Sequence, residues 1–157
     1  MRRPRYLLYI FSAVLLLSLA CHKETEEDRV RKVIIGVQHA AEEKKILSVL
    51  EHVSKTYQDP QGNDYDSIKG LLAFYFFRHQ RVGVFIPNID VTVTGPAAQA
   101  HFQAILTGKG TGEAAPSAIL PETLGAYNFE VLFKKEDSTW KVTSSKWGRV
   151  EEGAGRQ

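Results

Sequence analysis

The chain has 157 residues, a formal net charge of +2 and one cysteine, and 43% of its residues are hydrophobic. This length suits one domain with its own core, and a single cysteine excludes an internal disulfide and a multi-thiolate metal site. The near-neutral charge argues against a nucleic-acid-binding protein, which needs a clustered positive surface.

The first 20 residues have the pattern of an export signal. Arginines at positions 2, 3 and 5 precede an apolar run of fifteen residues over 6–20. As a helix rising about 1.5 Å per residue, this run covers about 22 Å, whereas the apolar core of a bilayer is about 30 Å thick. The run is therefore short for a transmembrane helix and is typical of a cleaved signal peptide.

Cys21 directly follows this run, and the whole stretch resembles the signal peptide of a bacterial lipoprotein. The resemblance implies that residues 1–20 are removed and that Cys21 carries the lipid anchor. Ser18 departs from the lipoprotein pattern, which usually has an aliphatic residue at this place. Because Ser18 and Ala20 also suit ordinary signal cleavage, an ordinary signal or an uncleaved anchor with an unpaired Cys21 is the alternative.

Removal of residues 1–20 leaves 137 residues with 17 basic and 18 acidic side chains, a net charge of −1. We expect residues 21–28 to form a lipidated tether, 29–150 the folded domain and 151–157 a disordered tail. The resemblance places the protein on a membrane of the cell envelope. In a Gram-negative cell, His22 in place of an aspartate after the cysteine resembles sorting to the outer membrane, facing the periplasm.

Apolar residues recur at intervals of three and four in three segments, which predicts three helices. A loop over 57–66, rich in glycine, proline, asparagine and aspartate, separates the second helix from the third. Asp66 or Ser67 is expected to cap the third helix. Phe74 and Phe77 widen its apolar face, so we expect it to be the most enclosed of the three. The predicted helical segments are 26–42, 46–53 and 68–79.

Beyond Arg81 the apolar period changes to two, which indicates β-strands. The first strand, over 82–93, changes parity at Pro87 and Asn88, which predicts an extra residue in a β-bulge. The second strand covers 98–106, and the glycine- and proline-rich stretch 108–125 is expected to be a long loop.

The last two predicted strands form a hairpin that turns at 136–138. Tyr127 and Phe129 lie on one face of its first strand, and Trp140 begins its second strand. Trp147 is out of phase with Trp140, which predicts a second bulge near Ser144-Ser145.

Three helices packed on a curved antiparallel four-stranded sheet form an α+β fold. This order resembles the nuclear transport factor 2-like (SnoaL-like) superfamily, most clearly in Phe129–Phe133, the acidic turn and Trp140-Lys141-Val142. The resemblance covers 26–150 and implies a cystatin-like cone with a pocket. Because the superfamily includes isomerases, dehydratases, hydrolases and non-catalytic proteins, the fold assigns no function.

Four residues are candidates for this pocket: Tyr57, Asp59, Tyr127 and Trp140. As a general base Asp59 would need a raised pKa, but its polar neighbours over 60–64 predict that it is exposed to solvent. Tyr127 is in phase with the apolar residues of its strand, so its hydroxyl is placed to point into the cone. A core tyrosine bonded to the backbone is the alternative.

No cofactor or metal is expected. The histidines show no pair at i, i+4, and His52 and His79 near helix ends are interpreted as structural. His101 alternates with apolar neighbours and is expected on the outer face of the sheet. The loop over 59–66 lacks the calcium-binding spacing, and 108–112 lacks the order of a phosphate-binding loop.

We therefore expect a membrane-anchored, non-enzymatic binding or scaffolding domain with a small apolar ligand and no nucleic-acid partner. A homodimer formed through the open face of the sheet is a further expectation. The alternative is a small pocket enzyme, an isomerase or hydrolase that uses Asp59 or a tyrosine. An enzyme would bring at least two ionisable side chains into one enclosed volume, whereas a binding module would line it with apolar residues and isolated polar groups.

Overall fold

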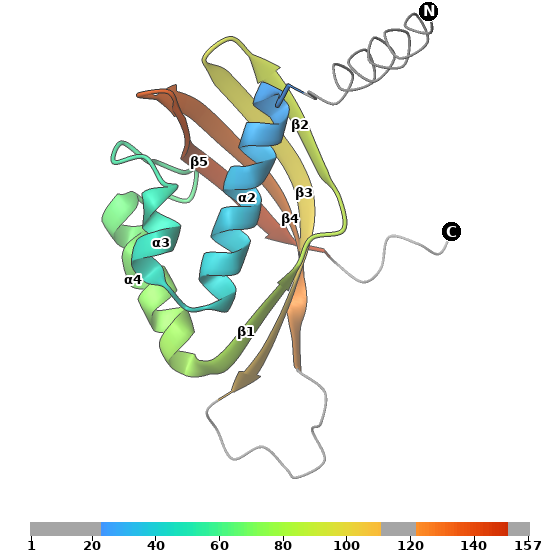
Figure 1. Ribbon diagram of the computed structural model, residues 1–157. Helices are drawn as coiled ribbons and strands as arrows, with labels where there is room; N and C mark the ends of the chain where they lie inside the picture. Colours follow the sequence, from blue (N-terminus) through green and yellow to red (C-terminus); the bar gives the residue numbers. More distant parts are fainter. Residues whose placement is uncertain (1–22, 111–121, 151–157) are drawn as a thin grey trace, which may run out of the picture.

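The computed structural model describes residues 23–110 and 122–150, which form three helices and one five-stranded antiparallel sheet (Figure 1). The expected α+β class, with helices before a curved sheet, is confirmed. The predicted signal peptide, Cys21, residues 111–121 of the expected loop and the tail over 151–157 lie outside the described residues. The elements are α2 (Glu26–Glu42), α3 (Ile46–Glu51), α4 (Tyr65–Arg78), β1 (His79–Phe85), β2 (Ile89–Thr94), β3 (Ala97–Gly110), β4 (Glu122–Glu136) and β5 (Thr139–Arg149).

The start of α2 is fixed by a capping box. The Thr25 hydroxyl accepts a hydrogen bond from the Asp28 amide at 3.1 Å, and the Asp28 carboxylate accepts one from the Thr25 amide at 3.2 Å. Acidic side chains fill the first turn, where the partial positive charge of the helix end favours them. Residues 26–28 are therefore helical, as their periodicity predicts, and are not part of the tether to which they were also assigned.

The start of α4 differs from the expectation. Asp64, rather than Asp66 or Ser67, is the N-cap residue, and its carboxylate accepts hydrogen bonds from the Ser67 amide at 2.8 Å and hydroxyl at 2.6 Å. The helix consequently begins at Tyr65.

The expectation that α4 is the most enclosed helix is wrong. Within α4, which is described over its whole length, Phe76 is the one buried residue. Phe74 and Phe77 are 57% and 85% exposed. Apolar residues surround this helix, but neighbouring elements cover only one side of it.

The strand order is β1-β3-β4-β5, and β2 also pairs with β3. β1 and β2 occupy the same edge of β3 because β4 occupies the other edge. The single strand expected over 82–93 is thus two strands, and the sheet has five instead of four. Pro87 interrupts the ladder because it has no N–H to donate. The register moves by one residue between the pairs Phe85–Ile105 and Ile89–Phe102, so the predicted extra residue is confirmed.

The second predicted bulge is also present. Leu132 pairs with Ser144 while Phe133 pairs with Val142, so Thr143 is the extra residue, one position from the expected place. The segment 52–58 covers part of the outer edge of β5 through backbone hydrogen bonds such as Ser54 N–H to the Val142 carbonyl at 2.8 Å. These bonds cover the edge of β5 at Val142 and Thr143, where it is not available for pairing with another chain.

α2 crosses the concave face of the sheet (Figure 1). Val30 and Ile34, in the first part of the helix, belong to the main core. Alanines on β3 let the helix approach closely, and the Trp140 indole N–H donates to the Glu26 carboxylate at 2.8 Å. The sheet residues of this core are Ala98, Ala100, Val131, Phe133 and Trp140. Within the described residues, no helix is long and apolar enough to span a bilayer.

Candidate ligand-binding cavity

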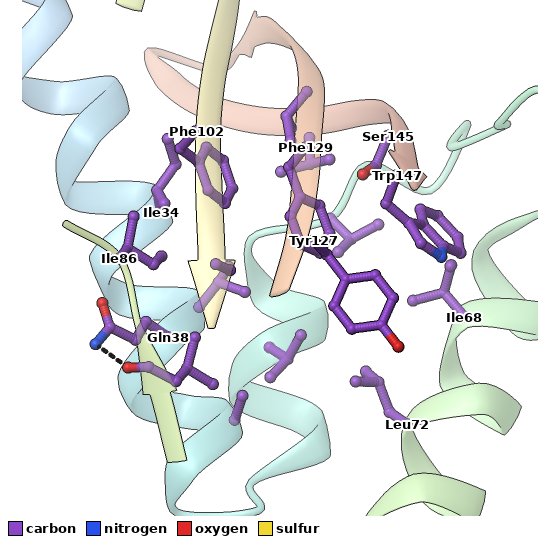
Figure 2. A pocket seen from close by; sticks show the side chains of 18 of the residues that line it. Ile34, Gln38, Ile68, Leu72, Ile86, Phe102, Tyr127, Phe129, Ser145 and Trp147 are labelled. Atoms are coloured by element: carbon purple, nitrogen blue, oxygen red, sulfur yellow. Dashed lines mark hydrogen bonds between the residues drawn. The ribbon is translucent and has the colours of Figure 1, made fainter. Parts of the chain in front are cut away.

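A cavity of about 420 Å³ lies between the three helices and the concave face of the sheet (Figure 2). Small-molecule sites in proteins have volumes of roughly 300–1,000 Å³, so this cavity is large enough for a ligand. The second half of α2, α3, α4 and all strands except β2 contribute lining residues. The molecule therefore has a packed core beneath the start of α2 and an unfilled volume beneath its end.

Simple periodicity places side chains in the cavity. Phe102, Ala104 and Leu106 on β3 alternate, so all three point to the concave face. On α4, Leu72 and Tyr75 are three residues apart and share the inward side. The residue spacings that predict the helices and strands thus also determine which of their side chains line the cavity.

The lining is almost entirely apolar. Among the described residues that line the cavity, none is Asp, Glu, Lys, Arg or His. A charged ligand would lose its hydration here without gaining a protein charge as partner, which costs several kcal/mol. The cavity therefore suits an uncharged, mainly apolar molecule. Its polar lining residues are Gln38, Tyr57, Tyr75, Tyr127, Ser145 and Trp147.

Two of these polar side chains already donate hydrogen bonds to other groups of the protein. The Gln38 amide donates to the Val84 carbonyl at 2.8 Å (Figure 2). The Tyr57 hydroxyl donates to the Asp59 carboxylate at 3.1 Å. Burial, together with the negative charge of Asp59, raises the pKa of Tyr57, so this phenol stays protonated.

Tyr75 and Tyr127 are placed differently. Neither hydroxyl makes a hydrogen bond with another described residue, and both tyrosines line the cavity. Burial raises the pKa of Tyr75, and the neighbouring Tyr127 raises it further. Figure 2 shows the Tyr127 hydroxyl pointing across the cavity toward Leu72 of α4.

Asp59, the candidate general base, is buried and does not line the cavity. Its side chain is 6% exposed, so the expectation of a solvent-exposed carboxylate is wrong. The loop folds back so that its own donors surround the carboxylate, from the Gln61 amide at 2.9 Å and the Asn63 amide and side chain at 2.8 and 2.9 Å. Burial alone would raise the pKa of Asp59, but these bonds and the Tyr57 hydroxyl hold it below its usual value.

The four candidate residues are thus split by the structure. Tyr57 and Tyr127 line the cavity, whereas Asp59 and Trp140 do not. Trp140 faces the same side of the sheet but lies in the main core, where its indole reaches Glu26. This correction follows from the position of α2, which covers Trp140 and leaves the more distant part of the sheet uncovered.

Sequence reasoning did not name Gln38, Tyr75, Ser145 or Trp147 as cavity residues. A signal exists for Trp147, because the extra residue at Thr143 brings odd positions after it onto the face that Val142 occupies before it. Tyr75 lies within the apolar stripe of its helix, which does not distinguish a cavity wall from a core.

The described histidines and acids are spread over the fold. His101 is exposed on the outer face of the sheet, as predicted. In the part of the chain that the structure describes, no three His, Cys, Asp or Glu side chains are grouped so that they could hold a metal ion.

No protein-family model matches the sequence, and no curated protein matches it. Several solved structures are similar. A candidate scytalone dehydratase from Novosphingobium aromaticivorans has a TM-score of 0.68 at 12% identity, over 78% of this chain and 83% of that chain. A nuclear transport factor 2-like superfamily protein from Salmonella enterica has a TM-score of 0.67 at 11% identity, over 83% and 96%.

A further similar structure covers more of the chain. A nuclear transport factor 2-like protein with a cystatin-like fold, also from Novosphingobium aromaticivorans, has a TM-score of 0.65 at 13% identity. The match spans 94% of this chain and 92% of that chain. Identities this low show a shared fold and no shared activity. The chain therefore has the cystatin-like fold that nuclear transport factor 2-like proteins have, which is the fold that the resemblance of its sequence implies.

Proposed function

We propose that this protein is a lipid-anchored binding protein of the cell envelope that holds a small, uncharged and mainly apolar molecule in its cavity. The observation that carries the proposal is the composition of the cavity wall, which within residues 23–110 and 122–150 includes no charged side chain and no histidine. Transfer of apolar surface from water into such a volume contributes about 25 cal/mol per Å², so the cavity favours apolar ligands.

A pocket enzyme is the second candidate, and the fold similarity to a candidate dehydratase favours it. Acid–base catalysis needs a group that exchanges protons near neutral pH. The raised pKa values of Tyr57 and Tyr75 keep both phenols protonated, and Asp59 is not among the residues that line the cavity. These features support binding over catalysis.

The proposed anchor is Cys21, in a Gram-negative cell at the outer membrane and facing the periplasm. A tether of a few residues would hold the cavity close to a bilayer. Apolar molecules concentrate in bilayers, so such an anchor would raise the supply of ligand to the cavity. The lipid and the cavity thus fit one role.

The test is native mass spectrometry of the full chain, extracted from the membranes of its own host in lipid nanodiscs. The wild type should carry a neutral small molecule. Ala41→Leu places three more carbon atoms in the cavity and should remove most of that molecule. Ala73→Leu, the matched control on the exposed side of α4, should retain it. Equal occupancy of the wild type and Ala41→Leu would contradict the proposal.

A further inference from the structure

We propose that the cavity contains a subsite for a neutral oxygen atom, formed by the hydroxyls of Tyr75 and Tyr127 and the indole N–H of Trp147. This inference rests on the proposed binding function and adds the chemical class of the ligand. The ligand is a mainly apolar molecule that carries a carbonyl, ether or hydroxyl oxygen as hydrogen-bond acceptor.

All three donors belong to side chains that line the cavity. They come from α4, β4 and β5, and none makes a hydrogen bond with another described residue. In the described part of the chain, no fully buried side-chain nitrogen or oxygen lacks a hydrogen-bond partner. The three donor atoms are therefore not enclosed by packed protein and are accessible to water or to a ligand.

The side chains that carry the three donors lie near one another. Trp147 pairs with Phe129, two residues along β4 from Tyr127, so the two side chains are diagonal neighbours on one face of the sheet. Figure 2 shows the Tyr127 hydroxyl and the nitrogen-bearing edge of Trp147 both directed toward α4, beside Ile68. Tyr75 is on the inward side of that helix, and Tyr127 is near enough to raise its pKa.

The three donors need a hydrogen-bond acceptor as their partner. An indole N–H only donates, and a protonated phenol donates one hydrogen bond, so together they call for an acceptor. An anionic acceptor is disfavoured, because no Lys, Arg or His lines the described cavity wall. A hydrocarbon would displace water from these donors without replacing its hydrogen bonds. A neutral oxygen atom accepts hydrogen bonds from these donors and carries no charge that would be left without a partner.

Tyr57 provides an internal contrast. It also lines the cavity, but its hydroxyl already donates to Asp59. Of the three cavity tyrosines, only Tyr75 and Tyr127 therefore have a proton to offer a ligand within the described structure. The subsite lies at the side of the cavity next to α4 and does not extend to the loop that holds Asp59.

The experiment uses the full chain in lipid nanodiscs and three probes of similar shape. These are acetylnaphthalene, a neutral ketone, isopropylnaphthalene, its hydrocarbon counterpart, and naphthoate, the anion. Equilibrium dialysis against protein-containing and empty nanodiscs gives the dissociation constants after subtraction of lipid partitioning. We expect the ketone to bind about tenfold more tightly than the hydrocarbon, and naphthoate to bind most weakly.

Tyr127→Phe removes one donor and keeps the ring. It should weaken ketone binding by about three- to tenfold and leave hydrocarbon binding unchanged. Tyr65→Phe, outside the cavity, is the matched control and should change neither. The carbonyl stretching frequency of the bound ketone, lowered by hydrogen bonding in the wild type, should rise in Tyr127→Phe.

Two results separate the subsite from the binding function. Equal affinity for the ketone and the hydrocarbon, with no effect of Tyr127→Phe, would overturn the subsite and leave the binding function in place. Failure of both neutral probes to bind would overturn the binding function for ligands of this size. Preference for naphthoate would overturn the neutral class of ligand.

Discussion

At the scale of single residues, Asp59 shows how a loop can bury a carboxylate to which no cation among the described residues is bonded. Four hydrogen bonds from Tyr57, Gln61 and Asn63 replace the water that the carboxylate loses. Hydrogen bonds to a charged group are worth about 1.5–3 kcal/mol each, more than those between neutral groups. Asp59 is thus a structural centre of the loop between α3 and α4.

Asp59→Asn should lower the free energy of unfolding at pH 7 by about 1–3 kcal/mol, because an amide presents a donor to groups that also donate. The pKa of Asp59 is lowered in the folded protein. Its contribution is therefore present above the unfolded pKa of about 3.9 and is lost as pH falls through the lower folded value. Urea unfolding at several pH values should show the difference between wild type and variant shrinking below about pH 4.

Asp66→Asn is the control, since this carboxylate is exposed in the first turn of α4. We expect a change of at most about 0.5 kcal/mol at any pH. If Asp66→Asn lowered the free energy of unfolding as much as Asp59→Asn, the buried position of Asp59 would not explain the effect.

The candidate site could be predicted from sequence only where a regular element carries it. Tyr127 lies in the cavity because alternation along β4 places it there, and alternation is visible in the sequence. Asp59 could not be placed, because its burial depends on loop amides whose directions no periodicity encodes. Trp140 and Trp147 are both tryptophans, so residue type does not distinguish them. The path of α2 decides which of them is covered.

At the scale of the helices, α4 is held through one side only. Phe76→Ala should lower the free energy of unfolding by about 3 kcal/mol, because it empties a buried site. The adjacent Phe77→Ala is chemically identical but removes a side chain that is 85% exposed, and should change it by less than about 0.5 kcal/mol. Urea unfolding of both variants tests this, and equal losses would show that α4 is rotated relative to the described structure.

The contact of α2 with the end of α3 depends on a glycine. A Cβ atom at Gly36 would lie 2.8 Å from Nε2 of His52, closer than van der Waals contact allows. Burial, aided by the charge of Lys141, lowers the pKa of His52, which keeps the packed ring neutral near pH 7.

Gly36→Ala should therefore act differently in two backgrounds. In His52→Ala it should stabilise the protein by about 1 kcal/mol, the gain in helix propensity from glycine to alanine. With His52 present, displacement of the ring should cancel at least half of that gain. A double-mutant cycle measured by urea unfolding gives the coupling, and additive effects would contradict the close contact.

The sequence pattern predicted the helices and strands better than it predicted which of their side chains are buried. The bounds of α2 and both parity changes in the strands follow from local spacing and capping, which act within a few residues. The exposure of Phe77 could not be predicted, because an apolar residue on a helix does not show whether a neighbour will cover it. The count of strands differed because Pro87 breaks the ladder while the chain continues along the same edge of β3.

At the scale of the whole molecule, α2 also hydrogen-bonds to the edge of the sheet at Val84. The Val84 amide donates to the Glu42 carboxylate at 3.1 Å, and its carbonyl accepts from Gln38. β1 is an edge strand, so these groups would otherwise be open to another chain. The first part of α2 thus covers the core, and its second part lines the cavity and hydrogen-bonds to β1.

The proposed anchor at Cys21 concerns where the whole domain is held. Cys21→Ser should abolish incorporation of a labelled fatty acid and release the protein from the membrane fraction, because a hydroxyl cannot form the thioether that anchors a lipoprotein. Ser18→Leu restores the aliphatic residue usual at that place and should label at least as strongly as the wild type. Unchanged labelling of Cys21→Ser would contradict the anchor and leave the cavity as the sole basis of the proposed function.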